Sequence, residues 1–161
     1  MTTKELETEL RRLQLVLLLE SPSLNRGGCG IFARHFYERV NIQNAQKRIL
    51  YLGHSKRTLE DKLDSIKANR TRENWAASHV IVAITIKRKT LYVDGHKTYR
   101  TLSAAKDEYT CDFHVDVPID LLKRAVKKKG DWNDSFRRSS SERAVKEIIV
   151  KWVTSLNTTT K

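Results

Sequence analysis

The segment from residue 78 to residue 94 constrains the fold more than any other part of the chain. Its first half, Ser78–Ile86, is rich in β-branched residues and favours a β-strand. Lys87–Lys89 can form a turn, and Thr90–Asp94 has the composition of a second strand. We therefore predict a β-hairpin here, with the two strands antiparallel and adjacent.

The rest of the chain reads as helices before and after further short strands. Amphipathic periodicity predicts helices over residues 3–20, 29–40 and 58–69, from 118 or 120 to about 129, and from 141 to the C-terminal region. Short strands are expected at 48–53 and 111–117. This order predicts an α+β fold in one domain over 1–161, with an N-terminal helix at 3–20, a core at about 21–117 and a helical part at about 118–156.

The first helix shows the strongest apolar stripe. Leucines recur at helical spacing, and further apolar residues are expected to widen the buried face near its end. The stripe consists of Leu6, Leu10, Leu13 and Leu17, and the widening residues are Leu15, Val16, Leu18 and Leu19. Thr3 is the expected cap of this helix.

Composition excludes several classes of protein. The longest apolar run, Leu15–Leu19, is far below the ~20 residues that span a bilayer, so no membrane association is expected. Two cysteines are too few for a disulfide framework or a cysteine-rich zinc site. The acidic start of the chain does not resemble a secretory signal, and a compact basic chain of this kind would suit a cytoplasmic protein of bacterial, phage or viral origin.

The charge of the chain keeps a polyanionic partner open. Lys and Arg number 31 against 19 Asp and Glu, a formal net charge of +12. Basic runs lie at Lys87–Lys89, between Lys123 and Lys129, and at Arg137–Arg138. Such runs are usually solvated surface, and no helix-turn-helix, zinc-finger or RNA-binding aromatic motif accompanies them. Nucleic acid or an acidic protein therefore remains an alternative partner without a specific motif.

The segment Asn25–Ala33 gives the clearest indication of a catalytic residue. It places Cys29 where a loop becomes a helix, with Gly27 and Gly28 before it and a third glycine after it. Small neighbours let a substrate backbone approach the sulfur, so Gly27 and Gly28 are candidate substrate-binding residues. The helix N-terminus favours a thiolate, and the Cys29 N–H could stabilise an oxyanion. The competing interpretation is a buried structural cysteine.

The predicted hairpin supplies two partners for this cysteine. His79 opens the first strand and Asp94 ends the second, so both fall at the open end of the hairpin, within side-chain reach. Asp94 could orient His79, and His79 could take the proton of Cys29. Taken singly, His79 reads as a surface residue and Asp94 as the start of a turn.

The order Cys, His, Asp resembles the papain-like cysteine hydrolase superfamily. The short forms related to transglutaminases and to bacterial cell-wall NlpC/P60 peptidases are nearest in size. The resemblance covers about residues 20–96 and implies a papain-like core and acyl transfer through a thioester on Cys29, with no cofactor or metal. Papain has a Gln before its cysteine that helps to form the oxyanion hole, whereas this chain offers Asn25 or Arg26 there. Family membership does not select among peptidase, amidase, deamidase and transglutaminase.

Several residues compete with this triad or could complete it. His54 and His96 are alternative bases, and Asp112 is a fallback orienter. His35 is expected on a helix surface, and Trp75 could line the active site or lie in the core. On a strand, Cys111 and His114 would point to opposite faces and make a poor metal pair.

Two hypotheses therefore follow from the sequence. The first is a cysteine hydrolase acting on a protein or peptide substrate, which the basic charge biases towards an acidic one. The second is a non-enzymatic basic binding protein, on a fold that could be a degenerate papain-like one.

Overall fold

The computed structural model describes residues 1–24, 27–68, 79–127 and 142–158. These residues form six helices and one antiparallel sheet, which confirms the α+β class. The sheet has the strand order β4-β3-β2-β1-β5. Its strands are β1 (Ala45–Gly53), β2 (His79–Ile86), β3 (Lys89–Val93), β4 (Thr98–Tyr99) and β5 (Phe113–Val117).

Strand β2 occupies the centre of the sheet and is buried on both faces. It pairs with β1 on one side and with β3 on the other. Val80, Val82 and Ile84 join the larger core cluster, whereas Ile81 and Ala83 join a smaller cluster on the opposite face. Because both faces need apolar side chains, the strand reads as a continuous β-branched run rather than as an alternating one.

The hairpin between β2 and β3 closes through a two-residue turn. Lys87 and Arg88 have φ values of 45° and 70°, the left-handed geometry that a tight antiparallel hairpin requires at both central positions. Strand β3 therefore begins at Lys89, one residue earlier than predicted. His79 begins β2 and Asp94 follows β3, so both lie at the end of the hairpin away from this turn.

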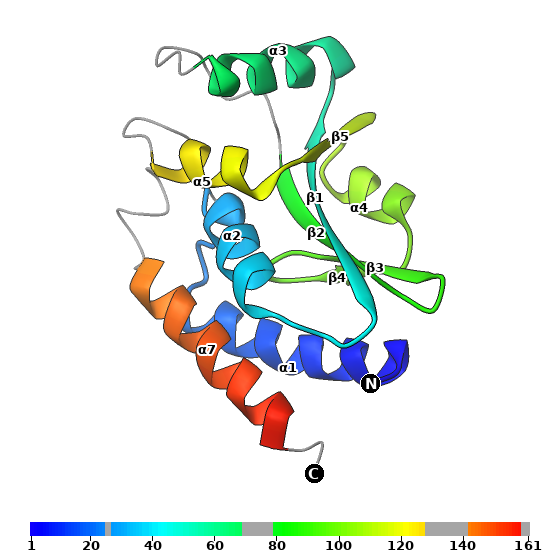
Figure 1. The fold of residues 1–161 in the computed structure, drawn as a ribbon, viewed down its shortest axis with the longest axis vertical. Coiled ribbons are helices and arrows are strands. Elements are labelled where there is room, and N and C mark those ends of the chain that lie inside the picture. Colours follow the sequence, from blue (N-terminus) through cyan, green and yellow to red (C-terminus); the bar gives the residue numbers. More distant parts are fainter. Residues whose placement is uncertain (25–26, 69–78, 128–141, 159–161) are drawn as a thin grey trace.

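Helices cover the two faces of the sheet unequally (Figure 1). The larger core cluster contains residues of α1, α2, α3, α5 and α7, whereas α4 contributes to the smaller cluster on the other face. The helices are α1 (Thr3–Glu20), α2 (Cys29–Arg39), α3 (Lys56–Lys67), α4 (Leu102–Glu108), α5 (Ile119–Lys127) and α7 (Glu142–Thr158). Helix α7 packs across α1 and α2, and the Trp152 indole N–H donates to the Glu9 carbonyl at 3.0 Å.

Helix α1 corrects one prediction about its buried face. The leucine stripe is buried as expected, but the residues predicted to widen it are exposed, Leu19 by 80 %. The exposed residues are Leu15, Val16, Leu18 and Leu19. Gln14, on the same helix, is buried although it is polar, because its side-chain amide donates to the Asp94 carbonyl in the turn that follows β3. The cap is Thr2 rather than Thr3, in a capping box with Glu5.

Two short elements were missed by the sequence patterns. Strand β4 and helix α4 lie between residues 98 and 108, where the sequence mixes polar and small residues and only Ala105 of α4 is fully buried. The predicted end of the helix that begins at 118 or 120, at about residue 129, lies outside the described residues. Within the described part of the chain, no helix combines the length and the apolar character needed to cross a bilayer.

Candidate active site

Three elements bring Cys29, His79 and Asp94 to one end of the sheet. Cys29 begins α2 and belongs to the larger core cluster. His79 lies two residues before Ile81 on β2, so the two side chains point to the same face of the sheet. Ile81 belongs to the smaller cluster on that face, to which α4 contributes. The side of the sheet that carries the larger core cluster and the side covered by α4 therefore meet at this end of β2. The three side chains are deeply buried, with 2 %, 1 % and 0 % of Cys29, His79 and Asp94 exposed.

The start of α2 is built from the glycines that precede Cys29. Gly27 has a φ of 100°, a conformation that a residue with a Cβ adopts only with strain. Gly28 is the N-cap residue, and because glycine has no side chain it cannot accept a cap hydrogen bond from the first turn of α2. The first N–H groups of a helix have no intrahelical acceptor, so those around Cys29 form a partial positive charge beside its sulfur. Gly27 and Gly28 thus shape the backbone that presents the thiol.

The imidazole of His79 lies between Cys29 and Asp94. Its Nε2 is 3.2 Å from Asp94 Oδ2, and the Cys29 side chain is its other hydrogen-bonding partner. Burial acts to lower the pKa of His79, but the charges of Cys29 and Asp94 and their hydrogen bonds outweigh it and raise the pKa to about 9. The charged imidazolium is therefore favoured at neutral pH.

Asp94 is held as a carboxylate by several donors. Its Oδ1 accepts the backbone N–H groups of His96 and Lys97, each at 2.7 Å. Its Oδ2 accepts from His79 and from the hydroxyls of Tyr99, at 3.2 Å, and Tyr109, at 2.5 Å. Burial acts to raise the pKa of Asp94, but hydrogen bonds and charge from His79, with those donors, hold it well below its ordinary value.

The two tyrosines were missed by sequence reasoning. Tyr99 lies in β4 and Tyr109 at the C-terminal end of α4, the two elements that had no sequence pattern. Tyr109 also stacks on the His79 ring, with 3.6 Å between ring centroids and 18° between planes. Only the fold brings these phenols to Asp94, so no local signal in the sequence could have identified them.

Gln14 links α1 to this site through its side-chain hydrogen bonds. Its Nε2 donates to the Asp94 carbonyl at 3.1 Å and to Thr98 Oγ1 at 3.0 Å. The turn between β3 and β4 is thereby fixed to a helix far away in sequence. This contact explains why a polar residue is buried in the apolar face of α1.

The other predicted residues lie outside this constellation or outside the described residues. Asn25, Arg26 and Trp75 fall among residues that the structure does not describe, so their predicted roles stay predictions. His54 and Asp112 are exposed. Asp94, not the fallback Asp112, is the carboxylate that bonds to His79.

Two further histidines are partly or fully buried. His96 is half-buried beside Asp94, and burial lowers its pKa. His35 corrects a prediction: it is buried, with 4 % exposed, rather than on the helix surface. Its Nε2 lies 2.8 Å from Glu142 of α7, and its Nδ1 lies 2.9 Å from an Arg39 nitrogen. This histidine therefore joins α2 to α7.

No metal centre emerges from the described residues, among which no three His, Cys, Asp or Glu side chains form a candidate ligand group. Cys111 precedes β5 and is buried, whereas His114 is exposed on that strand. The cysteine and the histidine predicted to be a poor metal pair thus do not share the strand.

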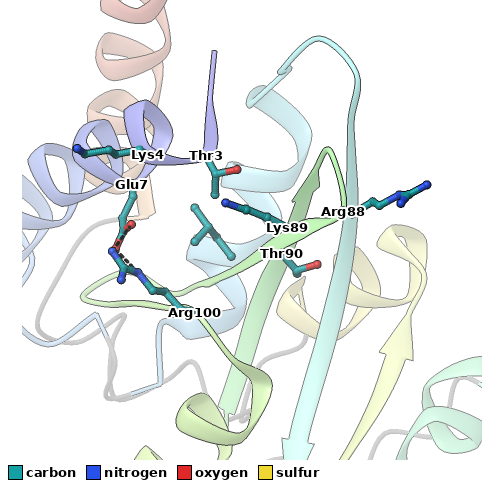
Figure 2. A pocket seen from close by; sticks show the side chains of 8 residues that line it. Thr3, Lys4, Glu7, Arg88, Lys89, Thr90 and Arg100 are labelled. Atoms are coloured by element: carbon teal, nitrogen blue, oxygen red, sulfur yellow. Dashed lines mark hydrogen bonds and ion pairs between the residues drawn. The ribbon is translucent and has the colours of Figure 1, made fainter.

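A separate cavity of about 550 Å³ lies at the hairpin turn, at the other end of β2 and β3 from His79 (Figure 2). Its lining includes the basic residues Lys4, Arg88, Lys89 and Arg100. Arg100 is bonded to Glu7 at 3.0 Å, and Lys4 and Arg88 extend in opposite directions (Figure 2). The cations of this cavity therefore do not converge on one point, as an anion-binding site would require.

Comparison of the chain with protein-family models, with curated proteins and with solved structures finds no match. The function of this site is accordingly inferred from its geometry and chemistry.

Proposed function

We propose that this protein is a cysteine-dependent acyl-transfer hydrolase with a papain-like core. Cys29 is the nucleophile, His79 carries the proton, and Asp94 orients His79. The observation that carries the proposal is the His79 imidazole, which is bonded to Asp94 through Nε2 and has the Cys29 side chain as its other partner. A nucleophile, a base and an orienting group in sequence-distant elements are the arrangement that covalent catalysis requires.

The reaction would proceed through a thioester on Cys29. The Cys29 thiolate attacks the carbonyl carbon of the substrate, and the carbonyl electrons move to the oxygen. When this tetrahedral intermediate collapses, the bond to the leaving group breaks and the His79 imidazolium gives the leaving group its proton. Neutral His79 then takes a proton from water as the water oxygen attacks the thioester. When this second tetrahedral intermediate collapses, the bond between the carbonyl carbon and the Cys29 sulfur breaks, and the sulfur keeps the electron pair. The carboxylic acid leaves, and the Cys29 thiolate and the His79 imidazolium are restored.

The start of α2 supports the oxyanion in this scheme. The Cys29 N–H lies in the first turn of the helix, where donors lack intrahelical acceptors. Asn25 remains the candidate for the second donor. The proposed substrate is a peptide or protein carbonyl. Peptidase, amidase and deamidase reactions share the same steps and differ only in the leaving group.

Acetylation by p-nitrophenyl acetate tests this proposal without knowledge of the natural substrate. The wild-type protein should release p-nitrophenol and carry one acetyl group on Cys29 under acid quench, located by peptide mass spectrometry. Cys29→Ala should release p-nitrophenol no faster than buffer. Cys111→Ala is the matched control, because Cys111 is also a buried cysteine outside any disulfide and its thiol donates to the Tyr109 carbonyl at 3.3 Å, and it should behave as wild type.

A different result would favour the alternative function. If Cys29→Ala kept the wild-type rate, Cys29 would not be the nucleophile and the hydrolase proposal would fail. Salt-sensitive binding to nucleic acid that is unaffected by Cys29→Ala would then support a basic binding protein.

A further inference from the structure

Tyr109 contacts both His79 and Asp94, through different parts of its side chain. Its ring lies parallel to the imidazole of His79, with 3.6 Å between centroids. Its hydroxyl donates to Asp94 Oδ2 at 2.5 Å, in the range of charge-assisted O–H···O⁻ bonds. A single phenol therefore fixes the plane of the imidazole and the carboxylate oxygen to which the imidazole bonds.

The backbone around Tyr109 is held in one conformation. Its N–H donates to the Lys106 carbonyl at 3.2 Å, and the Cys111 N–H donates to the same carbonyl at 2.8 Å. Thr110 between them has a φ of 51°, where β-branched residues are rarely found. Conformations of this kind persist where the surroundings enforce them, and they are frequent at functional sites. The end of α4 is thus built to present Tyr109 at a defined position.

Tyr99 provides a natural comparison at the same oxygen. Its hydroxyl also donates to Asp94 Oδ2, but at 3.2 Å, and it lies 3.4 Å from the Tyr109 hydroxyl. The stacked partner of His79 is Tyr109. The two phenols share the charge of Asp94, and Tyr109 holds the shorter bond and the imidazole contact.

We propose that Tyr109 is a positioning residue for the His79–Asp94 pair, holding the imidazole in the plane that presents it to Cys29 and reducing the charge that Asp94 directs at it. This role rests on the proposed hydrolase function. It is not a catalytic role, because Tyr109 acts through His79 and Asp94. Burial and the charge of Asp94 raise the pKa of Tyr109 well above its ordinary value, so the phenol remains a donor at working pH.

Removal of the Tyr109 hydroxyl has a predictable electrostatic effect. The groups around the His79–Asp94 pair are Cys29 from α2, His96 from the turn after β3, Tyr99 from β4 and Tyr109 from the end of α4. With one donor lost, Asp94 presents more negative charge to the imidazole. The His79 imidazolium is then favoured further, and its pKa should rise by about 0.5.

The experiment measures the pKa of His79 by NMR in protein with labelled histidine, with His79→Gln used to assign the resonance. Wild type, Tyr109→Phe and Tyr99→Phe are compared, since phenylalanine keeps the ring and removes only the hydroxyl. We expect the pKa to rise in both variants and to rise more in Tyr109→Phe. In the p-nitrophenyl acetate assay, kcat of Tyr109→Phe should fall about tenfold with KM little changed.

The outcomes separate this proposal from the proposed function. If His79 titrates near its ordinary value in wild type, its pairing with Cys29 and Asp94 is absent and the hydrolase function fails. If His79 titrates high in wild type but neither its pKa nor kcat changes in Tyr109→Phe, the function stands and the positioning role is refuted. Equal changes of the His79 pKa and of kcat in Tyr99→Phe would also refute it, since the shorter Tyr109–Asp94 bond would then have no larger effect than the longer Tyr99–Asp94 bond.

Discussion

Replacing His79 with Gln should remove a specific part of the pH dependence of stability. In the folded protein the His79 pKa is raised from 6.5 to about 9, because the charges and hydrogen bonds of Cys29 and Asp94 outweigh burial. In the unfolded chain these partners are absent, so the pKa returns to its ordinary value. The folded state therefore binds the His79 proton more tightly than the unfolded state does, and protonation stabilises the fold.

The size and pH window of this contribution follow from the two pKa values. A rise from 6.5 to about 9 corresponds to about 3 kcal/mol at 1.36 kcal/mol per pKa unit. The contribution is present in full below about pH 6.5 and is lost as the pH rises through about 9. Asp94 has a lowered pKa, so its own contribution is lost only on acidification below its ordinary pKa of 3.8.

Urea unfolding followed by circular dichroism measures this effect. Between about pH 6 and about pH 9.5, wild type should lose about 3 kcal/mol more of its unfolding free energy than His79→Gln. Cys29→Ala removes one of the two side chains that raise the pKa of His79 and should show an intermediate loss. Equal losses in wild type and His79→Gln would refute the reasoning, because His79 would then not be stabilised as an imidazolium in the fold.

Three further variants test single parts of the site. Asp94→Asn removes the carboxylate charge and should lower the pKa of His79, measured by NMR; an unchanged pKa would show that Asp94 does not orient the ring. Gly27→Ala places a Cβ at a φ of 100° and should cost about 1–2 kcal/mol in urea unfolding, whereas an unchanged midpoint would remove the need for glycine there. His96→Gln should keep the rate of p-nitrophenyl acetate hydrolysis, since His79 is the base; loss of that rate would make His96 the base instead.

The hairpin shows why part of this site could be predicted. A strand buried on both faces needs β-branched residues throughout, and such a run is visible without any knowledge of its neighbours. Once β2 and β3 are placed, geometry brings their open ends together, which puts His79 beside Asp94. The Cys29 position followed from its glycines, because a loop-to-helix junction is a local feature.

The parts that could not be predicted depend on contacts between distant segments. Leu15 and Leu19 lie on α1 beside the leucine stripe, but only the packing of the sheet and α7 decides which leucines are covered. Gln14 is buried because the turn after β3 presents a carbonyl to it. Tyr109 reaches Asp94 from a short helix with little apolar periodicity. None of these contacts leaves a pattern in the local sequence.

The central claim is that His79 activates Cys29, and the rate of Cys29 alkylation by iodoacetamide tests it most directly. Peptide mass spectrometry distinguishes Cys29 from Cys111, which serves as an internal reference within each sample. At about pH 7 the alkylation of Cys29 should be at least about tenfold faster in wild type than in His79→Gln, with Cys111 unchanged. Equal rates of Cys29 alkylation in the two proteins would contradict the claim.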